Sequence, residues 1–202
     1  MKPLATAFAV ALTAAAAAGA GAAEPTPTKP DEQKPAASAP RTAAEIRAEL
    51  YNRLADSKDE DETEGLIGLL SASYSRSESP TIDLLLQRAH KAIEARDYDA
   101  AGKILDAAVA FMPDEPEPWN ARATLRFLDD DYDGSMADIA QTLKREPRHV
   151  GALMGMATIL RSRDRKKEAL QVYERVLAIA PHWKDAETAA DKLRAEVAGQ
   201  EL

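Results

Sequence analysis

The sequence predicts an all-α protein, a solenoid built from antiparallel helix pairs. Two observations indicate this fold class: prolines recur at a fixed spacing, and each one follows an apolar helical stretch. Pro113, Pro147 and Pro181 are separated by 34 and 34 residues. A period of this length is typical of repeat proteins whose unit is one pair of helices. One pair cannot bury its apolar face alone, so we expect neighbouring units to stack.

The repeat extends beyond the prolines. Small and large apolar residues recur when the sequence is shifted by the same period, and the aligned sets are Ala89, Ala123 and Ala157; Ala101, Ser135 and Ala169; Leu105, Ile139 and Tyr173; and Val109, Leu143 and Leu177. Small residues let two helix backbones approach closely. Proline ends the second helix of each pair, because it lacks an N–H and clashes with the preceding turn. We therefore expect helices at 82–95, 98–111, 116–129, 132–145, 150–163 and 166–179.

This pattern resembles the tetratricopeptide repeat family. The repeat region is predicted at 79–181, and its three units are predicted at about 82–115, 116–149 and 150–183. Trp119 occupies the aromatic position near the start of a repeat. Arg88 and Arg122 stand where the family usually has leucine, and alanine replaces its glycine in all three units. The resemblance implies a right-handed superhelical solenoid in which the first helix of each pair lines a concave face.

Helical segments are also predicted on both sides of the repeats. Thr42 and Glu45 form a capping-box pattern, and Ile46, Leu50 and Leu54 follow at helical spacing. We expect residues 42–78 to form a degenerate helical hairpin, a fourth unit of repeat-like length. Residues 184–202 are expected to form a capping helix and tail, because alanines and Leu193 share one side of a helix that is charged elsewhere.

The first 23 residues have the features of a signal peptide. A positive start at Lys2 precedes an apolar run from Leu4 to Ala18, and small residues suited to cleavage follow. A membrane anchor or a low-complexity alanine tract is the alternative. Residues 24–41 contain five prolines and no large apolar side chain, so we expect a disordered proline-rich linker. The prediction is a periplasmic protein without an integral membrane segment after cleavage.

Composition excludes several classes of function. The formal charge is −8 and the basic residues are scattered among acids, so nucleic acid is not an expected partner, since phosphate binding needs clustered cations. The chain has 0 cysteines, which removes disulfides, thiol nucleophiles and thiolate metal ligands.

One segment imitates a calcium-binding loop. Residues 129–134 (DDDYDG) match the start of an EF-hand loop, but that loop needs a glutamate at its twelfth position, where this chain has Ala140. The repeat alignment explains the segment as a turn between two helices. We therefore predict no metal site here.

The histidines form no pair at a spacing that seats zinc on a helix. His149 and His182 are expected in loops, as solvated residues, and His90 is expected to line the groove. Neither a G-x-S-x-G elbow nor a phosphate-binding glycine loop occurs. We therefore expect no enzyme activity, no cofactor and no metal.

The predicted site is the concave groove. The family resemblance implies that the first helices of the units supply partner contacts, namely Asp83, Leu86, Gln87, His90, Glu117, Asn120, Thr124, Phe127, Met154, Thr158 and Arg161. Some family members hold a C-terminal carboxylate with a Lys/Asn/Arg set, and the corresponding positions here are Leu86, His90, Ala121, Gly151 and Gly155. That clamp is absent.

The sequence therefore predicts a non-catalytic scaffold in the cell envelope that binds a protein or peptide segment in the groove. A self-associating assembly or structural factor is the alternative. An enzyme that uses a pocket of carboxylates is the less favoured third hypothesis.

Overall fold

The part of the chain that the structure describes is built from α-helices joined by short turns. The computed structural model describes residues 41–77 and 79–199, so the predicted signal peptide and nearly all of the predicted linker lie outside it. Within those ranges no strand occurs, and the helices are α1 (Ala43–Ala55), α2 (Glu60–Tyr74), α3 (Pro80–Glu94), α4 (Tyr98–Phe111), α5 (Pro116–Leu128), α6 (Tyr132–Arg145), α7 (Val150–Ser162), α8 (Lys166–Ile179) and α9 (Lys184–Gly199).

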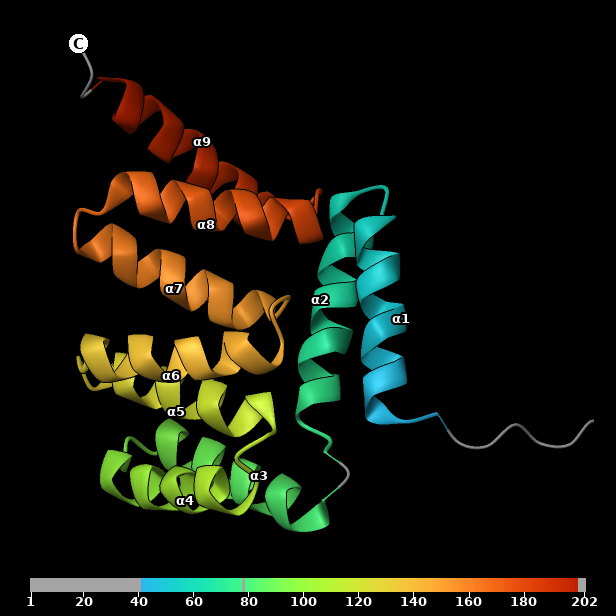
Figure 1. Ribbon diagram of the computed structural model, residues 1–202, viewed down its shortest axis with the longest axis vertical. Helices are drawn as coiled ribbons and strands as arrows, with labels where there is room; N and C mark the ends of the chain where they lie inside the picture. Colours follow the sequence, from blue (N-terminus) through green and yellow to red (C-terminus); the bar gives the residue numbers. More distant parts are fainter. Residues whose placement is uncertain (1–40, 78, 200–202) are drawn as a thin grey trace, which may run out of the picture. The chain divides into compact units, whose positions relative to one another are not determined.

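The three helix pairs α3–α4, α5–α6 and α7–α8 stack in chain order, with α9 against α8 (Figure 1). The six helices predicted within the repeats are confirmed, and each boundary agrees within two residues. The aligned small residues Ala89, Ala123 and Ala157 are all buried. At one crossing, Ser135 of α6 donates a hydrogen bond to the carbonyl of Ala123 on α5 at 2.8 Å. The recurring spacing in the sequence thus corresponds to positions where two helices touch.

The turn inside each pair repeats as closely as the helices do. Arg96, Asp130 and Asp164 have φ values of 59°, 59° and 58°, and they are 34 residues apart. Each residue occupies the left-handed position just after a helix, where glycine is usual. The next amide in each turn bonds back to the helix, from Asp97 to Ala92, from Asp131 to Arg126 and from Arg165 to Leu160.

The N-terminal hairpin is present as α1 and α2, but it packs differently from the repeats. It lies across the ends of the repeat helices (Figure 1). Leu54, Leu66 and Leu70 join one buried cluster with Val150 and Ala180, which lie where α7 begins and α8 ends. The connections between repeats thus provide the apolar surface on which the hairpin rests.

The last helix covers the open end of the solenoid. Ala186, Ala190 and Leu193 of α9 are buried with Val172 and Tyr173 of α8 in a single cluster. The opposite side of α9 is charged and exposed, which keeps the end of a repeat stack in contact with water.

Candidate partner-binding groove

Three adjoining hollows follow the first helices of the repeats, and we call them together the groove. The α3 recess, of about 510 Å³, is lined by Ser75, Asp83, Leu84, Leu86, Gln87, His90, Lys91 and Glu94. The central recess, of about 200 Å³, is lined by Leu70, Ser71, Tyr74, Ser75, His90, Glu117, Asn120, His149, Val150 and Gly151. The apolar pocket, of about 190 Å³, is lined by Asn120, Ala123, Thr124, Phe127, Ser135, Ile139, Gly151, Ala152, Gly155, Thr158 and Ile159. His90 belongs to the first two hollows and Asn120 to the last two, so the groove is continuous.

The apolar pocket has no ionisable residue in its lining. Ile139 and Ile159 are buried, and Phe127 packs edge to face on Tyr132 with ring centroids 5.6 Å apart. Asn120 and Thr124 supply amide and hydroxyl groups at the lining. An apolar cavity of about 150 Å³ holds a benzene-sized molecule, so this pocket fits one aliphatic or phenyl side chain.

Two glycines of α7 create the space in that pocket. A Cβ at Gly155 would lie 3.5 Å from the Ile139 Cδ1 atom, and one at Gly151 would lie 3.4 Å from the His149 ring. The first of these is an ordinary van der Waals contact, so a Cβ fits at position 155, in the lining of the pocket, without a shift of its neighbours.

His149 connects the groove to the hairpin. Its side chain caps α7, with Nδ1 accepting a hydrogen bond from the amide of Ala152 at 3.1 Å. Because Nδ1 is the acceptor, the ring proton is on Nε2, which lies 3.3 Å from the carboxylate of Glu117. The ring also packs on Tyr74 of α2, with centroids 4.4 Å apart.

The prediction that His149 is a solvated loop residue is wrong, because its exposed fraction is 4%. Part of its burial comes from Tyr74 of the hairpin, which is distant in sequence and packs on its ring. The second part of the same prediction is confirmed, since His182 is exposed.

Two tyrosines fasten the hairpin beside the groove. The hydroxyls of Tyr51 and Tyr74 form a buried hydrogen bond of 2.8 Å. The guanidinium of Arg148 lies 4.3 Å from the centre of the Tyr51 ring, and that of Arg47 lies 5.1 Å from the Tyr74 ring. Burial raises the pKa of Tyr51 to about 12 and also raises the pKa of Tyr74. Because α2 supplies Ser71, Tyr74 and Ser75 to the groove, the hairpin forms one of its walls.

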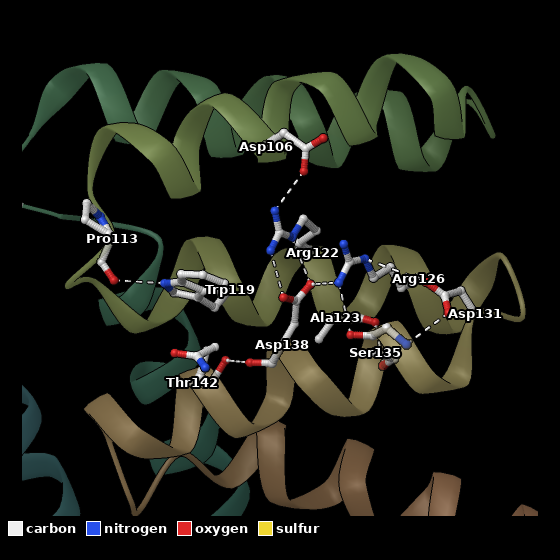
Figure 2. Close-up of polar contacts among 12 residues, drawn as sticks. Asp106, Pro113, Trp119, Arg122, Ala123, Arg126, Asp131, Ser135, Asp138 and Thr142 are labelled. Carbon is white, nitrogen blue, oxygen red and sulfur yellow. Dashed lines mark hydrogen bonds and ion pairs between the residues drawn. The ribbon is translucent and has the colours of Figure 1, made fainter.

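An ion-pair network around one buried aspartate holds α5 in place (Figure 2). Asp138 of α6 is 2% exposed, and it accepts two hydrogen bonds from Arg122, each of 2.8 Å. Arg126 also lies 2.8 Å from this carboxylate, and Arg122 reaches Asp106 of α4 at 2.8 Å. The hydrogen bonds from Arg122 raise the pKa of its guanidinium group, and the bonds to Asp138 contribute more than the bond to Asp106.

The network explains the arginine that replaces the usual leucine. At 100° per residue, Arg122 and Arg126 project from the side of α5 opposite to Asn120, Thr124 and Phe127. Trp119 packs beside the network, with the Arg122 and Arg145 guanidinium groups 5.1 and 4.8 Å from its ring. The polar cluster therefore positions α5 and leaves its other side to the groove.

Nine of the eleven predicted groove residues line these hollows, and two do not. Met154 is half-buried against the core of the third repeat, and Arg161 is exposed near the end of α7. Sequence reasoning missed the residues of α2 and the two buried members from α6, Ser135 and Ile139. The hydrophobic pattern of α2 identified it as a helix, but nothing in the repeat pattern placed it beside the groove.

The acidic segment 129–134 forms a turn that leads into α6. Asp131 accepts a hydrogen bond from the amide of Gly134 and caps α6, as expected of a turn. No group of three histidine or acidic residues within residues 41–77 and 79–199 could hold a metal ion. No helix found there is long and apolar enough to cross a membrane.

The fold and the groove define a class, the all-α helical-repeat proteins that present a concave surface. A TPR repeat-containing protein of Rhizobium etli is 39% identical to this chain over 168 residues, which is 83% of this chain and 81% of the relative. The chain belongs to the tetratricopeptide repeat family. No family model matches it.

Solved structures agree with this fold. The first TPR of Spaghetti (RPAP3), bound to an HSP90 peptide, superposes with a TM-score of 0.56 at 20% identity and covers 60% of this chain and 96% of that one. The first TPR domain of human RPAP3 gives a TM-score of 0.55 at 20% identity over 60% and 95% of the two chains. MamA of MSR-1 gives 0.51 at 12% identity over 79% and 88%. At these identities the likeness concerns the fold.

Proposed function

We propose that this protein is a non-catalytic adaptor that binds an extended segment of another protein along α3, α5 and α7. The apolar pocket carries the proposal, because an uncharged recess for one side chain opens beside the amide of Asn120. An amide both donates and accepts hydrogen bonds, so it can pair with the backbone of an extended segment. The peptide bound to the structurally similar RPAP3 domain supports this mode of binding.

The groove favours an internal segment over a chain end. The positions that would clamp a terminal carboxylate hold Leu86, His90, Ala121, Gly151 and Gly155, and none of them is a lysine or an arginine. Asp83, Lys91 and Glu94 in the α3 recess present both signs of charge. The expected ligand has one uncharged apolar residue for the pocket and polar residues on the side of α3.

Selection from a phage-displayed library of random peptides tests this function. We expect the enriched peptides to share one aliphatic or aromatic anchor. Gly155→Leu should fill the pocket and weaken binding of such a peptide at least tenfold, a change of about 1.4 kcal/mol. Ala178→Leu adds the same side chain at an exposed site on α8 and should bind as the wild type does. Equal binding by Gly155→Leu and wild type would exclude the pocket.

We also propose that the adaptor acts in the periplasm. This follows from the signal-peptide pattern at residues 1–23. Cell fractionation and N-terminal sequencing check it: the protein should lack the first 23 residues or so and co-purify with periplasmic markers. A cytosolic protein that retains Met1 would contradict this location while leaving the groove unaffected.

A further inference from the structure

The hairpin has an apolar recess on a face that does not belong to the groove. This outer recess, of about 360 Å³, is lined by Ala43, Ile46, Leu50, Leu69, Ala72, Ser73 and Arg76. Leu69 is 52% exposed and Ile46 is 37% exposed. In a stacked array of helix pairs, the apolar face of one pair is generally buried by the next pair. The hairpin thus has an apolar face that the rest of the described chain leaves in contact with water.

Helix α2 has two different faces. Leu66, Leu70 and Tyr74 are buried. The other face carries Gly65, Gly68, Leu69 and Ala72, all exposed and spaced as neighbours along a helix surface, and the exposed Arg76 follows just after the helix ends. A Cβ at either glycine would meet no atom within 4 Å. Packing within one chain therefore does not require these glycines, and their surroundings leave room for a close helix neighbour.

Charge changes sign along this face. Asp61 lies about two helical turns before Leu69, in an acidic first turn. At the other end, Arg76 follows two residues after the last residue of α2 and lines the outer recess with Leu69. No ion pair joins Asp61 or Arg76 to another residue that the structure describes. A copy of this helix laid antiparallel would place opposite charges against each other at both ends.

We propose that this face binds a second copy of the chain across a two-fold axis, with the two α2 helices antiparallel. Leu69 of each copy enters the hole bounded by Gly65, Gly68 and Ala72 of the other, in the manner of a knob in a hole. Arg76 of each copy then faces Asp61 of the other. The interface is isologous, so every contact occurs twice.

Dimerisation and partner binding use separate sides of α2. Ser71, Tyr74 and Ser75 line the groove, whereas Leu69 and Ala72 line the outer recess. A dimer would therefore present two accessible grooves. This arrangement allows two segments of one partner to bind with greater avidity than one segment alone.

Sedimentation equilibrium of the purified protein at micromolar to millimolar concentration tests the dimer, and charge exchange tests its geometry. Arg76→Glu and Asp61→Arg should each weaken self-association at least roughly fivefold, since each replaces two attractive pairs with two repulsive ones. An equimolar mixture of these two variants should form a heterodimer, because both junctions are then complementary. Arg175→Glu makes the same charge change on exposed α8 and should dimerise like the wild type.

A second variant separates association from folding. Gly68→Gln introduces a better helix former, so the monomer should melt at the same or a higher temperature while dimerisation weakens at least fivefold. A wild-type chain that is monomeric at every concentration would overturn the proposal. So would a mixture of Arg76→Glu and Asp61→Arg that associates no better than either variant alone.

Discussion

Arg122 of α5 donates two hydrogen bonds to Asp138 of α6, from Nε and Nη2, each of 2.8 Å. Asp138 is almost fully buried, so it needs these donors to offset the loss of water. Removing one member of a buried pair leaves an uncompensated charge, whereas replacing both with apolar residues is often tolerated. The position that usually holds leucine in this family is therefore coupled here to a carboxylate on the next helix.

We predict that Arg122→Leu lowers the free energy of unfolding by about 2 kcal/mol, less than a fully isolated charge would cost because Arg126 still contacts Asp138. The double variant Arg122→Leu/Asp138→Leu should regain most of this loss. Urea unfolding of both variants checks the coupling. A single variant as stable as the wild type would show that the network contributes nothing.

His149 should stabilise both the third repeat and the docked hairpin. We predict that His149→Ala lowers the free energy of unfolding by about 2 kcal/mol, with about 1 kcal/mol from the lost helix cap and the rest from the lost ring packing on Tyr74. His149→Asn retains a capping group and should cost less. Limited proteolysis should show earlier cleavage in residues 41–77 of His149→Ala, and unchanged cleavage there would argue against a link to the hairpin.

The sequence predicts the helix pairs of the repeats but not the position of the hairpin, because only the contacts of the repeats recur at a fixed period. Ala89, Ala123 and Ala157 mark contacts within or between adjacent units, so their positions recur along the chain. The contact between Tyr74 and His149 joins residues far apart in sequence and follows no period.

The groove was predictable in part for the same reason. His90, Asn120 and Thr124 occupy first-helix positions that the repeat identifies, whereas Ile139 enters the apolar pocket from the second helix because Gly155 leaves a gap above it. The sequence alone identifies Arg122 as a departure from the family pattern. Its pairing with Asp138 is visible only in the folded chain.

The buried tyrosine pair predicts a loss of stability at high pH. Folding raises the pKa of Tyr51 from 10.0 to about 12 and raises that of Tyr74 as well, so the folded state holds protons that the unfolded chain releases. The stabilisation from this pair is fully present below pH 10 and is lost as the pH rises from 10 through about 12, with a slope of roughly 1 kcal/mol per pH unit for each tyrosine.

Unfolding in urea between pH 8 and 11 measures this effect as a difference between two proteins. The variant Tyr51→Phe/Tyr74→Phe removes both hydroxyls, leaves no unpaired buried donor and should change stability little at pH 8. Above pH 10 its stability should fall less steeply than that of the wild type. Parallel curves for the two proteins would mean that the tyrosines are not the titrating groups.

Substitution by glycine should stabilise this protein at the left-handed positions of its turns. Arg96, Asp130 and Asp164 all have φ near +59°, a conformation that a side chain disfavours and that glycine adopts freely. Asp164→Gly should raise the free energy of unfolding by about 0.5 to 1 kcal/mol, and Arg96→Gly should do the same, although glycine also gains entropy in the unfolded chain. Gly substitution at exposed Ala178, in the middle of α8, should instead lower stability by about 1 kcal/mol. The melting temperature, measured by circular dichroism, should therefore rise for glycine in the turns and fall for glycine at position 178. A lower melting temperature for Asp164→Gly would show that the interactions of the Asp164 carboxylate contribute more to stability than relief of the strained turn.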